Sequence, residues 1–596
     1  MTAYPAGPVY DENKTHRVAV EIRNGLPNAS NGVFDFVPFT GGPPDFERKI
    51  VDNDTCFACH DRLEFHGRAP GPRTDVDFCV TCHNPSSVDG NTGNSVDMKV
   101  LMHNIHSGRD GYVIQGFGPF PHDYSDVKWT QDIRNCQTCH EETDTNTPQA
   151  SNWREVPNRA ACGTCHFDDG IADNGKHDYA IEDGTHPFGQ QFEDDSLCLL
   201  CHGPEADIAG GSVRVAVAHE IPEAIAAKAF EYKVVGIADT GPGDTPTASI
   251  QVLNPMDPNY AADPESTAYD INDPAGPFQA SRARLKVDIA WTSRALGNLD
   301  PNDDLARPAD DGAPFAPIAI DFVSGATTTD NITFTKSASS AIPTGITGSG
   351  LAILEGRPRV MIDGSLTSLT VAANTLSFAI TDDNPQDRRK VVDIDKCNDC
   401  HNNLSLHGDQ RSGNTEVCSS CHNPNATDIN RRGVEDSDCD MELGPIEESI
   451  DLKHMIHRIH SGTVGVCGFN ESAHAYFDVV YPGHLNNCEG CHLPGAYYPV
   501  DPAQVLATTI DTGDIRSILA DDTAISPNTS VCSSCHAHRN TLASEHMKQN
   551  GGDFEAGKDE TGALISSGVE TCELCHGEGR TADVKEMHNV GDFQFN

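Results

Sequence analysis

Twenty of the 22 cysteines in this 596-residue chain form ten C-x-x-C pairs, and a histidine directly follows every pair. Two thiols at this spacing can form thioethers to the vinyl groups of a porphyrin, and the adjacent imidazole can then bind the iron. The sequence therefore predicts ten c-type haems, numbered one to ten in chain order. The motifs are Cys56, Cys59 and His60; Cys79, Cys82 and His83; Cys136, Cys139 and His140; Cys162, Cys165 and His166; Cys198, Cys201 and His202; Cys397, Cys400 and His401; Cys418, Cys421 and His422; Cys488, Cys491 and His492; Cys532, Cys535 and His536; and Cys572, Cys575 and His576.

Paired cysteines also occur in zinc ribbons, redox dithiols and disulfide frameworks. None of these sites requires a histidine after every pair. Because all ten pairs carry that histidine, the pattern is typical of a decahaem cytochrome.

The second axial ligand decides what each iron can do, because a second histidine leaves a closed electron-transfer centre and an open position admits a substrate. Ten closed irons need 20 histidines, and the chain has 27. An internal repeat between the two halves of the chain identifies the candidates. The predicted distal ligands are His66, His103, His106, His186, His219, His407, His457, His460, His546 and His588.

Four of these histidines lie three residues apart in pairs, His103 with His106 and His457 with His460. On a helix this spacing puts both side chains on roughly one face. Two side chains on one face cannot bind opposite sides of one iron, so each pair should serve two neighbouring haems. The alternative is that one member of each pair only forms a cap or a hydrogen bond.

The remaining histidines are expected to have other roles. His122 and His474 correspond to each other in the repeat and are expected to contact haem propionates or backbone, or to replace a distal ligand if one of the looser assignments fails. The others are expected at the surface: His16, His177, His454, His484 and His538.

Two cysteines, Cys439 and Cys467, stand outside the haem motifs. In an oxidising compartment such an isolated pair favours a structural disulfide, which would fix the loop that contains Cys439. A redox switch and a pair of free thiols are the alternatives.

The repeat also divides the chain. Residues 41–220 and 388–596 have the same layout and are predicted to be two five-haem modules, rich in coil and short helices. Between them, residues 221–387 contain short alternating runs separated by turn residues, which predict an antiparallel sandwich or split-barrel-like domain. Residues 1–40 resemble the end of that domain, with 16–21 matching 358–363, and are predicted to be remnant strands of a first β domain.

The composition excludes several classes of function. A formal net charge of −48 disfavours binding to nucleic acid or to an anionic membrane surface, and no apolar run is long enough for a transmembrane helix. Haem attachment takes place outside the cytoplasm, so export is expected, although the first residues lack the features of a signal peptide. An acidic segment could bind Ca²⁺, but it lacks the spacing of a calcium loop, and a solvated surface is the preferred interpretation: Asp300, Asp303, Asp304, Asp310 and Asp311.

Several motifs resemble those of the OmcA/MtrC family of decahaem outer-membrane cytochromes from metal-reducing bacteria. They are the LxxHG sequences at 63–67 and 404–408, the histidine pairs at 102–108 and 456–462, and the asparagine before the third and eighth motifs. The resemblance implies alternating β and pentahaem domains, bis-histidine ligation and a staggered cross of haems. In that arrangement the fifth and tenth haems lie at the ends of the long row, and the second and seventh face β domains.

The same resemblance implies a cell-surface conduit that takes electrons from a porin–cytochrome complex. Its acceptors would be iron and manganese oxides, flavins, humic substances or electrodes. Two other functions remain open at this point. One is a multihaem reductase of nitrite or sulfur oxyanions, which needs an open iron; the other is a subunit of a cytochrome filament, which needs a haem ligated across subunits.

Overall fold

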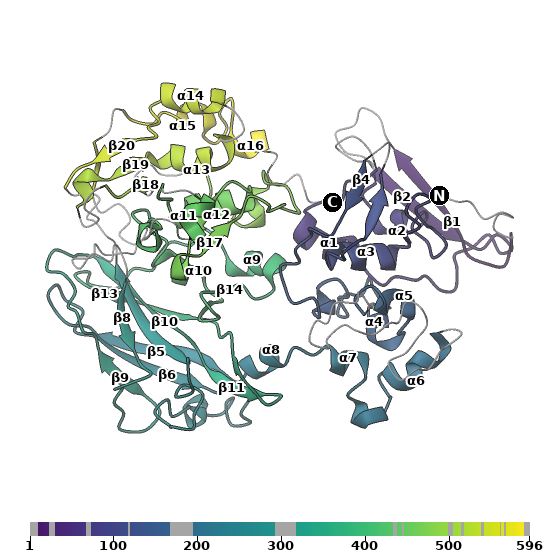
Figure 1. Ribbon diagram of the computed structural model, residues 1–596, viewed down its shortest axis with the longest axis horizontal. Helices are drawn as coiled ribbons and strands as arrows, with labels where there is room; N and C mark the ends of the chain where they lie inside the picture. The colour runs from purple at the N-terminus through teal and green to yellow at the C-terminus, as the bar shows by residue number, and fades with distance from the viewer. Residues whose placement is uncertain are drawn as a thin grey trace. The chain divides into compact units, whose positions relative to one another are not determined.

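The computed structural model describes residues 10–22, 30–66, 73–116, 120–166, 195–291, 317–432, 438–443, 446–498, 505–513, 518–537, 541–560, 562–565, 568–588 and 590. The chain divides into two compact units, Met1–Ile221 and Pro222–Asn596. Figure 1 draws the first unit in purple to blue and the second in teal to yellow. Within the described ranges, no helix is long and apolar enough to cross a membrane.

Short helices and loops make up most of the first unit. A polar side chain caps the start of several helices: Asp52 accepts a hydrogen bond from the amide of Asp54 at α1, and Asp75 accepts one from the amide of Asp77 at α2. These caps fix the helices that lead into the first two haem motifs. The helices are α1 (Asn53–His60), α2 (Val76–Cys79), α3 (Met98–His106), α4 (Asn152–Glu155), α5 (Arg159–Cys162), α6 (Cys198–His202) and α7 (Val215–Ala218).

Two hairpins accompany these helices, β1 (His16–Ile22) with β2 (Ser30–Phe36) and β3 (Val113–Gln115) with β4 (Pro121–Asp123). On β1, Arg17 forms an ion pair with Asp35 of β2 at 2.7 Å and donates to the carbonyl oxygen of Asp77 at 2.7 Å. The alternate side chains of the first hairpin, among them Val20 and Phe34, are exposed. One face of this hairpin therefore packs on the helices, and its apolar face points to solvent.

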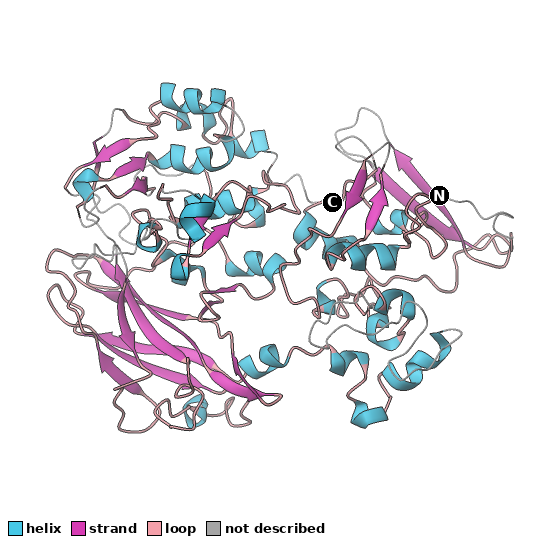
Figure 2. Ribbon diagram, viewed as in Figure 1, coloured by secondary structure: helices cyan, strands magenta, loops and turns pink. Residues whose placement is uncertain are grey.

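An antiparallel β domain opens the second unit, after α8 (Pro222–Ala227) (Figure 2). One sheet has the strand order β13-β10-β7-β8 and the other the order β5-β6-β9. Between them lies a core of fully buried side chains that includes Phe278, Trp291 and Phe334. The strands are β5 (Glu231–Ala238), β6 (Thr247–Leu253), β7 (Arg284–Trp291), β8 (Ile318–Asp321), β9 (Phe334–Ser337), β10 (Ser349–Arg357) and β13 (Asn374–Ala379), with a separate hairpin of β11 (Arg359–Ile362) and β12 (Ser365–Ser368).

Strand β10 is buried on both faces, which explains its continuous apolar sequence. Ala352 and Leu354 lie in the core between the two sheets. Leu351 and Ile353 pack on the opposite side with Val417. Because Val417 belongs to the C-terminal part of the unit, β10 joins the β domain to the helices that follow it, as does β13, where Thr375 donates to Glu416 at 3.0 Å.

The C-terminal part of the second unit repeats the helical layout of the first. Its helices are α9 (Ile394–His401), α10 (Thr415–Ser419), α11 (Asp438–Leu443), α12 (Leu452–His460), α13 (Pro527–His536), α14 (Thr541–Gln549), α15 (Glu573–His576) and α16 (Val584–His588). Its strands form two hairpins and one four-stranded sheet: β14 (Ser405–Leu406) with β15 (Arg411–Ser412), β16 (Gly465–Cys467) with β17 (Ala473–Ala475), and β18 (Thr508–Asp511), β19 (Thr523–Ile525), β20 (Ala556–Lys558) and β21 (Leu564–Ile565).

The contacts of β1 favour a different alignment from the sequence match of residues 16–21 with 358–363. Glu21 of β1 forms an ion pair with Arg73, and Glu355 of β10 forms one with Arg411, each at 2.9 Å. Each arginine lies between the first and second haem motifs of its own half. We therefore align β1 with β10 rather than with β11, since a short alternating stretch resembles more than one strand.

Candidate haem sites

Histidine rings face each other in pairs throughout both units. Each pair consists of the histidine of a C-x-x-C-H motif and one of the predicted distal histidines. In the first unit the ring centroids are 6.1 Å apart for His60–His106, 5.7 Å for His66–His83, 6.4 Å for His103–His140 and 5.8 Å for His166–His219. In the second they are 6.4 Å apart for His401–His460, 6.0 Å for His407–His422, 6.0 Å for His457–His492, 5.9 Å for His536–His588 and 6.1 Å for His546–His576.

The spacing of these rings fits one metal ion between each pair. A bond from a metal to an imidazole nitrogen is about 2.0–2.1 Å, so two nitrogens that share a metal lie about 4 Å apart. The Nε2 atoms of His66 and His83 are 3.5 Å apart. Two facing imidazoles beside two thiols are the donor set that a c-type haem iron and its vinyl groups require.

None of the motif cysteines forms a disulfide, and all are half-buried except Cys575, which is exposed. Within the described ranges, no group of three or more histidine, cysteine or carboxylate side chains is placed to hold a separate metal ion. Thioether attachment stays a prediction at every motif. It applies to the first cysteines, Cys56, Cys79, Cys136, Cys162, Cys198, Cys397, Cys418, Cys488, Cys532 and Cys572, and to the second cysteines, Cys59, Cys82, Cys139, Cys165, Cys201, Cys400, Cys421, Cys491, Cys535 and Cys575.

Backbone carbonyls hold several of the histidine rings in place. The Nδ1 atom of His83 donates to the carbonyl oxygen of Val96 at 2.7 Å, and that of His422 donates to Ile450 at 2.9 Å. Four distal histidines donate from Nδ1 to the carbonyl four residues earlier, at 2.8–3.0 Å: His106, His219, His460 and His588. A hydrogen bond at Nδ1 leaves Nε2 available to bind a metal and fixes the direction of the ring.

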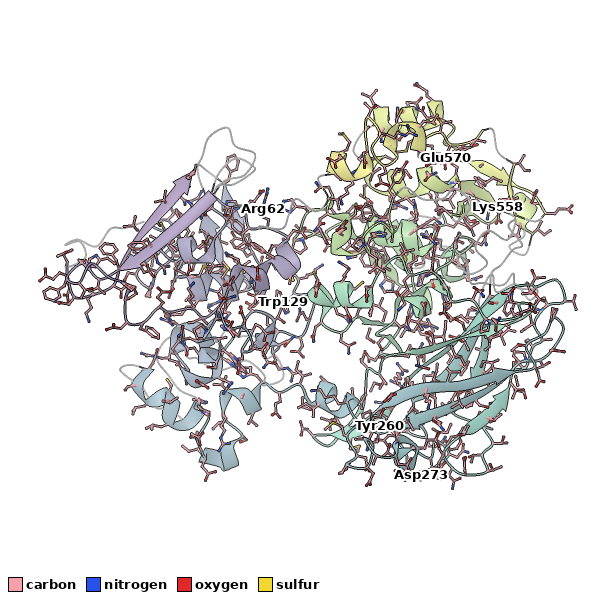
Figure 3. All side chains as sticks on the ribbon, turned by 180° about the vertical axis from the view of Figure 1, so that it is seen from behind. Arg62, Trp129, Tyr260, Asp273, Lys558 and Glu570 are labelled. Carbon is pink, nitrogen blue, oxygen red and sulfur yellow. A yellow bond between two sulfur atoms is a disulfide. The ribbon has the colours of Figure 1, made fainter. Side chains whose placement is uncertain are left out.

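Helix α3 places predicted ligands at two sites, because His106 faces His60 of the first motif and His103 faces His140 of the third. Helix α12 does the same for the sixth and eighth motifs through His460 and His457. In each unit an aromatic ring packs on the corresponding predicted distal histidine. The ring centroids of Trp129 and His106 are 5.2 Å apart, and those of Tyr481 and His460 are 5.6 Å apart. Trp129 is labelled in Figure 3.

These two aromatic side chains were missed by the sequence reasoning. The signal was present, because each lies seven residues before the first cysteine of its module's third motif, Cys136 or Cys488. The Nε1 atom of Trp129 is buried and has no hydrogen-bond partner in the structure. A buried indole N–H without an acceptor fits a site whose remaining acceptor, a haem carboxylate, comes from the cofactor.

The distal histidines of the second and seventh sites have an unusual backbone. His66 has φ 60° and His407 has φ 56°, in the left-handed region that side chains other than glycine rarely adopt. Such strain concentrates at functional sites, where the surrounding structure enforces it. Burial and nearby cations also lower the pKa of His407 to about 4, which favours the neutral imidazole that binds metals.

The predicted distal ligand of the fifth site, His186, lies outside the described residues, as does the acidic segment 300–311 that was considered for Ca²⁺. The motif histidine of this site is described: the Nδ1 atom of His202 donates to the carbonyl oxygen of Val213 at 2.8 Å.

The sites follow one another in an order that both units share. Burial raises the pKa of several motif thiols, and in some of them the thiol of a neighbouring site raises it further because two negative charges repel. In the first unit this coupling joins sites one and two, one and three, three and four, and four and five. In the second unit it joins sites six and seven, six and eight, eight and nine, and nine and ten. The same pairs of motifs are therefore neighbours in both units, and the second motif of each unit neighbours the first.

One histidine expected at the surface is instead buried. His454 has an exposed fraction of 4%, and its Nδ1 atom lies 3.0 Å from both the carbonyl oxygen of Ser530 and the hydroxyl of Ser534. It joins α12 to α13. The substitutes considered for distal ligands, His122 and His474, are exposed on the hairpins β3–β4 and β16–β17.

Cys439 and Cys467 form a disulfide whose Cα atoms are 5.7 Å apart. The sequence favours this pairing, and the structure contains it. Both residues are buried, and the bond fastens α11 to β16.

A fold with ten C-x-x-C-H motifs, whose histidines face second histidines at nine described sites, defines a multihaem c-type cytochrome. The sequence profile of the family described as outer membrane cytochrome MtrC/MtrF-like, domains II/IV, matches residues 48–213 and 389–589. The chain belongs to this family. The two matched ranges fall within the two halves of the internal repeat.

Individual relatives agree with this assignment. The chain is 24% identical to the multiheme cytochrome MtrC of Shewanella baltica (strain OS185) over 615 residues, which cover 95% of this chain and 76% of that protein. Its fold is similar to the crystal structure of MtrC from Shewanella baltica OS185, with a TM-score of 0.59, 19% identity, and coverage of 96% of this chain and 82% of that one. The decaheme outer membrane cytochrome OmcA gives a TM-score of 0.66 at 19% identity, over 98% of this chain and 80% of that one.

Proposed function

We propose that this protein is a ten-haem conduit that passes electrons at the cell surface to extracellular acceptors. The observation that carries the proposal is the set of facing histidine pairs, because two imidazoles on one iron leave no position for a substrate. Membership of an outer-membrane cytochrome family supports the location. The chemistry supplied by each bound haem is a reversible one-electron change of its iron.

The protein's own residues would hold the iron, exclude water from it and set its potential. The ten motif histidines and the ten predicted distal histidines, His186 included, are the proposed ligands, and the motif cysteines are the proposed attachment points. Carbonyl groups such as that of Val96 orient the rings. These features make electron transfer fast because the site does not rearrange when its charge changes.

The order of the sites supports conduction over a distance. Within each unit, haems at neighbouring motifs would give electrons a path through the first, third, fourth and fifth motifs of that unit, with a branch at the second. The fifth and tenth sites are the proposed ends of the path, and the second and seventh the proposed branches toward β domains.

The proposed acceptors are Fe(III) and Mn(IV) oxides, flavins, humic substances or electrodes, and the proposed donor is a porin–cytochrome complex in the outer membrane. A net charge of −48, before any haem carboxylates are counted, favours metal-bearing or cationic acceptors over anions.

Rapid mixing of the dithionite-reduced holoprotein with separate acceptors tests this proposal. We expect complete single-electron reoxidation of all haems by Fe(III) citrate, a suspension of iron oxide and flavin mononucleotide, and no turnover with nitrite or sulfite. Sustained nitrite reduction, measured as ammonium formed per haem oxidised, would contradict the conduit and favour an open-site reductase. Oxidation that depends on protein concentration, together with filaments in the electron microscope, would instead favour a filament subunit.

A further inference from the structure

An arginine follows the distal histidine of the second site in each module and pairs with a glutamate of a strand. Arg73 binds Glu21 of β1, and Arg411 binds Glu355 of β10, each through Nε at 2.9 Å. Strand β15, which contains Arg411, starts four residues after His407. The two modules thus place a guanidinium at corresponding positions, next to a histidine that has a left-handed backbone.

The pair in the second module belongs to a larger buried cluster. Lys286 of β7 lies 3.0 Å from the carboxylate of Glu355 and 2.9 Å from that of Asp288. The carboxylate side chains are 1% and 2% exposed, and Arg411 is 19% exposed. In the first module the side chains of Glu21 and Arg73 are 16% and 29% exposed. Water screens the first pair more strongly than the second.

Removing two cations and two anions from water is costly, and apolar side chains of similar volume could join the same surfaces at least as stably. The neighbouring cluster of Leu351, Ile353 and Val417 already joins β10 to α10 in that way. Adhesion between the β domain and the helices therefore does not account for the charges.

The charges act on the seventh site. Arg411 pairs with Leu406 across the β14–β15 hairpin, directly before His407 in the sequence, and Arg73 forms a β-bridge with Phe65, directly before His66. A cation close to a ligand of the iron disfavours the positive charge that the iron gains on oxidation, whereas the carboxylates of Glu355 and Asp288 act in the opposite direction. Cations held here should therefore favour the reduced iron.

We propose that Arg411, held in place by Glu355 and Lys286, is a positioning residue that raises the reduction potential of the seventh haem, and that Arg73 has the same but weaker effect on the second haem. This inference rests on the proposed bis-histidine haem between His407 and His422. It predicts that the seventh haem has a higher reduction potential than the second haem and therefore holds an electron more readily.

A difference redox titration of the holoprotein tests the proposal. In Arg411→Gln we expect the midpoint potential of one haem in ten to fall. At a fixed potential, the ratio of oxidised to reduced form of that haem should rise about tenfold, which corresponds to a fall of about 59 mV for a one-electron change. Arg411→Lys keeps the charge and should recover most of the midpoint. Lys233→Gln removes an exposed charge from β5, in the other sheet of the β domain, and should leave the titration unchanged.

Lys286→Met is a second variant that leaves the pair of Arg411 and Glu355 in place, and it should lower the same midpoint by a smaller factor. Unchanged midpoints in both Arg411→Gln and Lys286→Met, or an equal fall in Lys233→Gln, would overturn the proposal. Failure of the underlying function is seen separately, because the unmodified protein would then lack low-spin bis-histidine signals in its spectrum.

Discussion

At the scale of single residues, the role expected of each histidine follows from the side chain that its ring contacts. A motif histidine that faces a second ring across 5.7–6.4 Å is placed to share a metal, as in His60 with His106. His454 instead contacts the serines of α13. Its position in the helix is three residues before His457, and the first module has Val100 at the corresponding place.

Because His454 is buried against serines rather than against a motif histidine, it should make stability depend on pH. Burial lowers its pKa to about 4, below the value of about 6.5 in an unfolded chain. The folded protein therefore binds fewer protons than the unfolded chain between these values, and its stability falls as the pH is lowered from about 6.5 to about 4, by up to about 3 kcal/mol.

Replacement of His454 by Val, the residue of the first module, should remove that loss. Denaturant unfolding of the holoprotein at pH 7 and pH 4.5 measures it: the variant's midpoint should fall less on acidification than that of the unmodified protein. His474→Val, at an exposed position on β17, is the matched control and should behave like the unmodified protein. Equal falls in all three proteins would show that His454 does not titrate in this range.

At the scale of elements, helices place the attachment motifs, and their ends are fixed by polar contacts. Glu570, labelled in Figure 3, lies two residues before the tenth motif and accepts hydrogen bonds at the start of α13, the helix that carries the ninth. Its carboxylate accepts from the hydroxyl of Ser526 at 2.7 Å and from the amides of Asn528 and Thr529 at 2.7 and 2.8 Å. One side chain thus ties two consecutive sites together.

Glu570→Ala should destabilise the second unit by about 3 kcal/mol, because it leaves buried donors without an acceptor and removes a helix cap. Glu570→Gln keeps an acceptor oxygen and should cost less. Glu545→Ala, which breaks only an exposed ion pair with Lys548 on α14, should change stability by less than about 0.5 kcal/mol. Chemical denaturation measures all three, and similar effects of Glu570→Ala and Glu545→Ala would refute the assigned role.

The attachment motifs could be predicted from the sequence because thioether formation and ligation by the motif histidine need adjacent residues. The sequence could not predict which distal histidine faces which motif histidine. His66 lies six residues from His60 yet faces His83, since a left-handed turn at His66 redirects the chain. The cluster around Arg411 was also out of reach, because its members come from three distant segments that only the sheet brings together.

Sequence patterns predicted that residues 221–387 form an antiparallel β domain, but they did not predict how β1 aligns with the strands of that domain. The alternating runs indicated antiparallel strands between the two modules. The alignment of β1 with β10 depends on a contact between Glu21 and Arg73, 52 residues apart, that no local pattern records.

At the scale of the whole molecule, the two halves repeat one plan: five attachment motifs with the same neighbours, in which the second motif lies beside the first. Repetition of the order, together with the two helices that each serve two sites, keeps neighbouring sites close. The chain that carries these sites has a net charge of −48, which under the proposed function would favour metal-bearing or cationic acceptors over anions.

The measurement that tests the central claim most directly is low-temperature electron paramagnetic resonance of the oxidised protein, with haem counted by the pyridine haemochrome assay. The account predicts ten haems per chain and only low-spin signals of bis-histidine iron. A high-spin signal that integrates to one or more haems would contradict it, because an iron would then be open to substrate and the protein would be a reductase rather than a conduit.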